Sequence, residues 1–405
     1  MNLRKNNIRF LNKRNFFQFF FLLLLIFINR LAIPGFASLS VSIILLIFFI
    51  IFSAINNTIL LDKRNLIIYC IMLSLLFLST SVSMFVSTYN INFLGVFLAF
   101  LIYTLILFDF RVKFSKDVVL NVFFCFILIG FFQYFIYQIG GYYLDLSSII
   151  NSDLMVQGYN TSDGNDYIKK RINGFVFLEP SFFSQFIALY IILEHFFFGF
   201  KRIFRVVASL IVILLAASGT GPMLLLFYGV FYTIIQRNFK IIFMFLIVLL
   251  LLPVLISFGS AFAPNFMGYV FQRSGEFGLY GDTSFNYRFT LPYIYGYEFM
   301  LHSDYLSLLF GNGPFSTEEI NKRYWNSYSN FSTLLVSIFE YGWLFTFSYI
   351  LYLYRTTSRV FNIELQLSFL FMFFVLSGAF YQSYTIILFW ILCKIIDFDV
   401  KGRNI

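Results

Sequence analysis

The chain has 405 residues, of which 60% are hydrophobic and only 12% are charged, and its mean hydropathy is +0.84. A water-soluble domain carries about 25% charged residues, so this composition excludes a soluble protein. The net charge of +9 does not indicate a nucleic-acid partner, because the charges stand in short clusters between apolar runs. That placement is typical of topology signals in membrane proteins.

The apolar runs predict an all-α integral membrane protein with about twelve transmembrane helices, since about 20 apolar residues cross the hydrocarbon core as a helix. Two of the runs, 203–218 and 222–235, are short, so one re-entrant hairpin is the alternative for that pair. The first run is also short enough to be a signal-peptide core, although we expect an uncleaved helix. In chain order the predicted helices cover 16–33, 36–54, 66–86, 91–109, 118–138, 176–199, 203–218, 222–235, 241–258, 331–354, 365–380 and 383–396.

The distribution of lysine and arginine predicts the orientation of these helices. Most of the 28 basic residues fall in segments that lie inside if the N-terminus is cytoplasmic, as the positive-inside rule requires. Among the short outer loops only Arg30 breaks the rule. We therefore expect a single polytopic membrane domain over residues 1–405, with both termini cytoplasmic and two large periplasmic loops at about 139–175 and 259–330. Short helices are expected in the second loop, around Phe289–Leu301 and Thr317–Trp325.

The two outer loops are the predicted active-site region, because loops this much longer than a connector are usually functional. Acids slightly outnumber bases in each loop, so neither loop is a general trap for anions. Particular residues would have to hold an anion, and the arginine fork suits a diphosphate. The candidates are Arg171, Arg273 and Arg288, and the alternative is that each one is solvated or paired with a loop acid.

Two acids stand among apolar residues. Glu179 precedes Pro180 at the predicted outer beginning of a helix, where its pKa would rise and suit a general base. The alternative is an acid favoured by the helix dipole. Glu340 lies about ten residues into a predicted helix, and an acid within the membrane is either functional or a buried structural group. Glu194 and His195 are expected to form a pair at the inner membrane surface.

Aromatic residues, Tyr287 and Trp325 among them, are abundant in the outer loops. They could stack on sugars, or they could form an interfacial aromatic belt. No metal or other cofactor is predicted. His195 and His302 are far apart in the sequence, and Asp397-Phe398-Asp399 follows the last helix on the inner side, without a nucleotide-binding domain around it.

Three stretches resemble the bacterial O-antigen polymerases (Wzy) and, more distantly, the O-antigen ligases (WaaL). The first is Arg171-x-x-Gly174 followed by Glu179-Pro180-Ser181. The second is Arg288 followed after a helix-sized spacer by Leu309-Phe310-Gly311-Asn312-Gly313. The third is Ser329-Asn330 followed by Glu340-Tyr341-Gly342.

Two further features bear on this resemblance. The turn Ser218-Gly219-Thr220-Gly221 is similar to a short Ser/Gly turn that these proteins carry before their eighth helix. Ligases carry a histidine where this chain has Ser329, which argues against a ligase.

The resemblance implies a glycosyltransferase of the bacterial inner membrane that joins undecaprenyl-diphosphate-linked oligosaccharide repeat units at the periplasmic face. The growing glycan would pass from its lipid diphosphate to a sugar of the next lipid-linked unit. The donor already carries a good leaving group, so the reaction needs no metal. The expected partners are these lipid-linked substrates, the bilayer, a chain-length regulator and a flippase. The alternatives are a flippase or transporter for lipid-linked oligosaccharides and a ligase-like transferase.

The same resemblance suggests a role for each candidate residue. Arg288 and Arg171 would stabilise the departing diphosphate and Glu179 would be the general base. Substrate binding would fall to Arg273, Asn330, Glu340, Tyr287 and Trp325.

Overall fold

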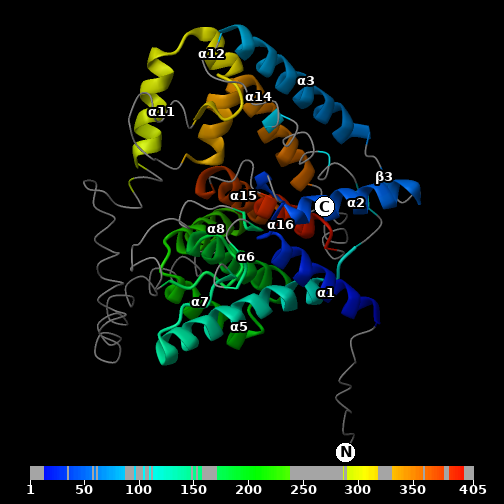
Figure 1. Cartoon of the computed structure of the whole chain (residues 1–405), viewed down its shortest axis with the longest axis vertical. Coiled ribbons are helices and arrows are strands. Elements are labelled where there is room, and N and C mark those ends of the chain that lie inside the picture. Colours follow the sequence, from blue (N-terminus) through cyan, green and yellow to red (C-terminus); the bar gives the residue numbers. More distant parts are fainter. Residues whose placement is uncertain are drawn as a thin grey trace, which may run out of the picture.

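The computed structural model describes residues 13–33, 36–56, 59–60, 63–86, 95–96, 104, 109–110, 113–146, 149–151, 154–156, 171–237, 286, 290–317, 331–358, 361–377 and 383–395. This part of the chain is mainly helical (Figure 1), which confirms the predicted all-α class in outline.

The N-terminal half supplies α1 (Lys13–Ile28), α2 (Val41–Ile55), α3 (Lys63–Val86), α5 (Lys116–Gly140), α6 (Pro180–Phe198), α7 (Ile203–Ala216) and α8 (Thr220–Gln236). The C-terminal half supplies α11 (Leu291–His302), α12 (Tyr305–Phe310), α14 (Thr333–Ser358), α15 (Ile363–Phe371) with its π-helical continuation η6 (Met372–Leu376), and α16 (Ser383–Cys393).

Most of the predicted helices are confirmed within a few residues. The runs at 203–218 and 222–235 form the helices α7 and α8. Both alternatives for this pair, two spans or one re-entrant hairpin, stay predictions. The predicted helix at 91–109 lies mostly outside the described residues, and that at 241–258 lies wholly outside them. In the second outer loop, α11 matches the helix expected around Phe289–Leu301. A further short helix, α12, was not predicted. Of the helix expected around Thr317–Trp325, Thr317 is helical and residues 318–325 lie outside the described residues.

Two short antiparallel strand pairs were not predicted. One joins β1 (Ala32–Ile33) to β2 (Phe36–Ser40), and the other joins β3 (Ile59–Leu60) to β4 (Asp109–Phe110). The first pair turns the chain between α1 and α2. Ser40 then caps α2, because its hydroxyl accepts the amide hydrogen of Ser42 at 3.1 Å.

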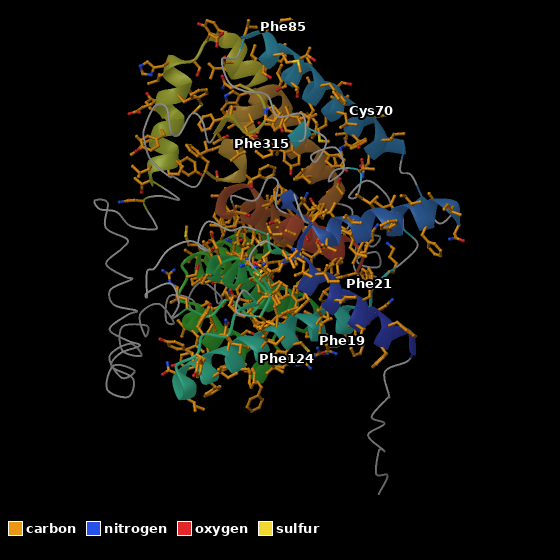
Figure 2. The ribbon with its side chains drawn as sticks, viewed as in Figure 1. Phe19, Phe21, Cys70, Phe85, Phe124 and Phe315 are labelled. Atoms are coloured by element: carbon orange, nitrogen blue, oxygen red, sulfur yellow. The ribbon has the colours of Figure 1, made fainter. Side chains whose placement is uncertain are left out.

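Many large apolar side chains are exposed on the surface of the described chain, as expected for a protein in a membrane. Four of its helices are long and apolar enough to cross a bilayer, namely the hydrophobic parts of α3, α5, α6 and α14, and five shorter apolar helices accompany them. Phe85 and Phe204 are 90% and 88% exposed, and Figure 2 shows Phe85 at the far end of α3. Large exposed apolar faces of this kind indicate contact with lipid.

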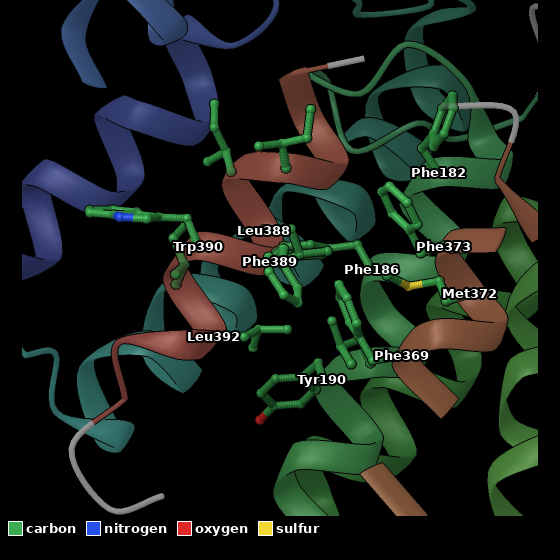
Figure 3. Close-up of a cluster of buried hydrophobic side chains, with 14 of the residues drawn as sticks. Phe182, Phe186, Tyr190, Phe369, Met372, Phe373, Leu388, Phe389, Trp390 and Leu392 are labelled. Atoms are coloured by element: carbon green, nitrogen blue, oxygen red, sulfur yellow. The ribbon is translucent and has the colours of Figure 1, made fainter. Parts of the chain in front are cut away.

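The helices form two groups that a third set connects (Figure 1). One group contains α3, α11, α12 and α14, and the other contains α1, α5, α6, α7 and α8. Between them lie α15, η6 and α16. Figure 3 shows the connecting core, where Phe186 and Tyr190 of α6 face Phe369 of α15 and Phe389 of α16. The most enclosed of these helices is α6, which is buried along almost its whole length.

The helix ends that were predicted to lie on the same side of the membrane lie together. On the predicted inner side, the amide of Gln18 donates to the carbonyl of Lys113 at 2.8 Å, and Arg202 pairs with Asp117 at 2.7 Å. On the predicted outer side, the chain after α1 lies beside the segment that follows α5, through a bridge between Leu31 and Met155. The candidate site is built at these outer ends.

Candidate functional site

The backbone conformation before α6 and the proline at its first position determine where this helix begins. The chain before it takes left-handed conformations, with φ of +64° at Gly174 and +70° at Phe175. Glu179 is extended, with φ −140° and ψ 153°, so the helix does not start at 176 as predicted. It starts at Pro180, whose fixed φ and missing N–H suit the first helical position. Glu179 is therefore the N-cap residue and does not lie one turn inside the helix.

The side chain of Gln133, near the end of α5, holds the segment 171–174 in place. Its amide nitrogen donates to the Asn173 side-chain oxygen at 2.8 Å and to the Leu144 carbonyl at 2.7 Å. Its oxygen accepts the amide hydrogens of Asn173 and Gly174, both at 3.0 Å. All of these partners lie on loops, so one buried side chain on α5 fixes the backbone of the predicted Arg171-x-x-Gly174 motif.

Charged groups gather beside this segment. Asn173 donates to the Asp145 carboxylate at 3.0 Å, and the Tyr143 hydroxyl donates to the Arg171 carbonyl at 2.6 Å. Burial raises the pKa of the Tyr143 phenol, and Asp145 raises it further. Glu179 is buried and accepts a hydrogen bond from the Ser181 hydroxyl at 2.8 Å. We call Arg30, Tyr143, Asp145, Arg171 and Glu179 the outer charged cluster.

The Ser/Gly turn before α8 lies against the first turn of α6. The Thr220 hydroxyl donates to the Ser181 carbonyl at 3.0 Å, and the Ser184 hydroxyl donates to the Ser218 carbonyl at 3.4 Å. A Cβ atom at Gly221 would lie 2.6 Å from the Ser184 carbonyl oxygen, so only glycine allows this approach. The structure thus brings together two stretches that are 40 residues apart in the sequence.

The second and third stretches form another contact, on α14. Gly342 interrupts this helix with φ 76° and ψ 176°. The carbonyls before the break accept hydrogen bonds from the loop after α12: Asn312 donates to Phe339 and Gly313 donates to Glu340, both at 2.9 Å. The loop amides thereby form hydrogen bonds with carbonyls that the break leaves without a helical partner. Backbone polar groups within a membrane need such bonds, because no water is there to supply them.

Glycines on both sides permit this contact. Gly311 has φ 80°, and a Cβ there would lie 2.5 Å from the Tyr341 amide nitrogen. A Cβ on Gly342 would lie 2.5 Å from the Phe310 amide nitrogen. We call this the glycine contact, formed by Gly311 and Gly342 with the backbone of residues 309–313 and 339–342.

Glu340 lies next to the glycine contact. It is 2% exposed, and its carboxylate accepts a hydrogen bond from the Thr317 hydroxyl at 2.9 Å. It is the eighth residue of α14, and so lies about 10 Å along the helix from Thr333 at 1.5 Å per residue. This bond ties α14 to the second outer loop.

Hydrogen bonds connect α6, which begins beside the outer charged cluster, to α14, which carries the glycine contact. Gln185 of α6 donates to the Leu376 carbonyl at 3.3 Å. The next carbonyl, of Ser377, accepts from both the amide and the hydroxyl of Thr333, at 2.8 and 2.7 Å. The outer beginnings of α6 and α14 therefore meet at the outer end of η6. Each of these helices follows one of the two long outer loops.

The structure places only some of the predicted site residues. Arg171 and Glu179 lie in the outer charged cluster and Glu340 lies by the glycine contact. The others lie outside the described residues, and their roles stay predictions: Arg288, Arg273, Asn330, Tyr287 and Trp325. No group of three or more potential metal ligands occurs within the described part of the chain.

Sequence reasoning missed several members of the site. Asp145 and Asn173 are ordinary polar residues of a polar loop, and Gln133 is a single polar residue in an apolar helix. No motif in the sequence marks any of the three as a site residue. Arg30 did carry one, because it was the exception to the positive-inside rule among the short outer loops.

The predicted pair of Glu194 and His195 is wrong. Adjacent helical residues point in different directions, and Glu194 instead accepts from the Tyr190 hydroxyl at 2.7 Å and lies 3.6 Å from Arg202. His195 bonds the Tyr228 hydroxyl at 2.7 Å. These groups lie at the opposite end of α6 from the outer charged cluster.

Comparison of the chain with protein-family models, with curated proteins and with solved structures gave no match.

Proposed function

We propose that the chain is a surface-polysaccharide polymerase of the bacterial inner membrane, which joins undecaprenyl-diphosphate-linked oligosaccharide repeat units at the periplasmic face. The proposal includes twelve membrane spans with both termini cytoplasmic. The observation that supports it best is the convergence of the motif stretches. The Arg171–Ser181 stretch and the Ser/Gly turn pack on each other, the Gly311 and Gly342 stretches pack on each other, and hydrogen bonds through Leu376 and Ser377 connect the two.

The reaction breaks the bond between the anomeric carbon of the donor glycan and its diphosphate oxygen. A hydroxyl oxygen of the acceptor sugar forms the new bond to that carbon and loses its proton. Undecaprenyl diphosphate leaves with the electron pair of the broken bond. The enzyme must therefore supply a base for the proton and positive charge for the diphosphate.

Glu179 is the proposed base. It is buried, it is a carboxylate at the outer end of α6, and the Ser181 hydroxyl holds one of its oxygens at 2.8 Å. That bond orients the carboxylate at the outer end of α6, where we propose that it meets the acceptor sugar.

Arg171 and Arg288 are the proposed ligands of the diphosphate, with Arg273 in support. Arg171 is half-buried at the edge of the outer charged cluster, where the head group of a lipid could reach it from the membrane surface. Its backbone carbonyl accepts a hydrogen bond from the Tyr143 hydroxyl, which fixes the position of the residue. The proposed sugar-binding residues of the second loop are Tyr287, Trp325 and Asn330, with Glu340 holding the base of that loop through Thr317.

The proposal can be tested with purified protein in liposomes and lipid-linked repeat units extracted from a host that lacks the gene. We expect glycans of two, three and more repeat units on lipid, with release of one undecaprenyl diphosphate for each new linkage. Movement of unextended units across the bilayer would instead indicate a flippase. Transfer to lipid A–core, without extension, would indicate a ligase. Either result would contradict the proposal.

A further inference from the structure

Arg30 is buried more deeply than any role in membrane topology requires. It follows α1, is 2% exposed, and its carbonyl accepts the Val156 amide hydrogen at 2.9 Å. The neighbouring bridge between Leu31 and Met155 brings the first outer loop against it. Its Nε and Nη1 atoms have no hydrogen-bond partner among the described residues.

Such a group is costly to leave unsatisfied. Arginine keeps its charge in proteins, and buried charged donors without acceptors are strongly destabilising. Burial lowers the pKa of the guanidinium, while the nearby Asp145, Tyr143 and Glu179 oppose that fall. The acids hold the side chain as a cation at this position, but its two buried nitrogens, Nε and Nη1, still need acceptor oxygens.

The charge of the cluster limits what that acceptor can be. Arg30 and Arg171 carry two positive charges, and Asp145 and Glu179 carry two negative charges. A phosphate brought to Arg30 would also meet the two carboxylates, which act on Arg30 electrostatically. Arg171 differs from Arg30 because its side chain is half-buried, whereas that of Arg30 is buried. A neutral ligand rich in hydroxyl or carbonyl oxygens satisfies the two donors of Arg30 and adds no charge.

We propose that Arg30 is a sugar-binding residue, whose Nε and Nη1 donate to hydroxyl or acetamido oxygens of the acceptor sugar beside Glu179. This assignment rests on the proposed function. It gives the two parts of the site different ligands. The deep, charge-balanced part takes the neutral sugar, and the loop arginines take the diphosphate. Arg30 then positions the hydroxyl from which Glu179 removes the proton.

The test compares two probes on the purified full-length chain in detergent. One is the repeat-unit oligosaccharide released by mild acid from the host's lipid-linked pool, and the other is farnesyl diphosphate. The measured quantity is the rise in melting temperature that each probe causes, over a range of concentrations. The variants are Arg30→Gln, Arg30→Lys and the control Arg355→Gln, which removes an exposed arginine at the other end of the bundle.

For wild type and Arg355→Gln we expect a response to both probes. For Arg30→Gln we expect at least a tenfold higher oligosaccharide concentration for the half-maximal shift, with the response to farnesyl diphosphate unchanged. Arg30→Lys keeps the charge but loses the planar fork in which Nε and Nη1 are held, so it should show the same selective loss. It also provides the test if Arg30→Gln does not fold.

Three results would overturn the assignment. They are an unchanged oligosaccharide response in the variants, a loss confined to farnesyl diphosphate, and a wild type that does not respond to the oligosaccharide. Failure of the proposed function is seen separately, in the liposome assay with wild-type protein. A chain that binds the oligosaccharide through Arg30 but forms no polymer would reject the polymerase and keep the sugar site.

Discussion

Replacing Gly342 by alanine should break the glycine contact. Gly342 has φ 76° and ψ 176°, a region that is essentially restricted to glycine. Adopting it destabilises the fold by about 1–3 kcal/mol for any other residue. The added Cβ would also lie 2.5 Å from the Phe310 amide nitrogen. Since that atom belongs to backbone, it cannot rotate away as a flexible side chain would.

The overlap adds to the cost of the conformation. Inserting a methyl group into a tightly packed site typically costs about 1–3 kcal/mol. The expected loss is therefore about 2–6 kcal/mol in the free energy of unfolding. The assay is unfolding in mixed micelles with increasing SDS, followed by tryptophan fluorescence.

Gly141→Ala is the matched control. Gly141 also has a positive φ, of 66°, but nothing lies within 4 Å of its Cβ position. Its replacement should cost about 1–2 kcal/mol, the price of a left-handed conformation alone. If Gly342→Ala loses no more stability than Gly141→Ala, the close approach of the two backbones is not real and the glycine contact must be rejected.

Three other substitutions test separate parts of the site. Glu179→Gln should slow chain extension by about 10²–10⁴-fold while leaving the protein folded, because it removes the base; extension is measured in the liposome assay, with the exposed Glu298→Gln as control, and a normal rate would exclude Glu179. Gln133→Leu leaves the amide hydrogens of Asn173 and Gly174 without their acceptor, so unfolding in SDS should become about 2–4 kcal/mol easier; unchanged stability would show that Gln133 does not hold the loop. Gly221→Ala should cost about 1–3 kcal/mol because its Cβ would push α8 from α6, and the same SDS measurement would refute that packing if the variant matched wild type.

The sequence predicted the existence of helices better than their ends. In the structure Gly141 ends α5 and Pro180 opens α6, through local preferences of the backbone. Apolar runs gave most of the remaining helices. The start of α6 was predicted four residues early because residues 175–178 are apolar, whereas the extended backbone of Glu179 places the first helical residue at Pro180.

Tertiary contacts were not accessible in the same way. In the sequence, Gly311 indicates a turn and Gly342 a destabilising residue within a helix. Nothing in the sequence predicts that the two glycines are in contact. The break in α14 becomes intelligible only with the loop amides that bond its carbonyls. Arg30 shows the converse case, since the sequence marked it as unusual but only the fold placed it beside Asp145 and Glu179.

The central claim, that the chain polymerises lipid-linked repeat units, is tested most directly by deleting the gene in its host. The measurement is a gel of the lipopolysaccharide, with the lipid-linked intermediates extracted in parallel. We predict that the ladder disappears and that the core carries a single repeat unit, because flipping and ligation continue without polymerisation. Core without any repeat unit would contradict the claim. Lipid-linked polymer would then indicate a ligase, and stalled single units would indicate a flippase.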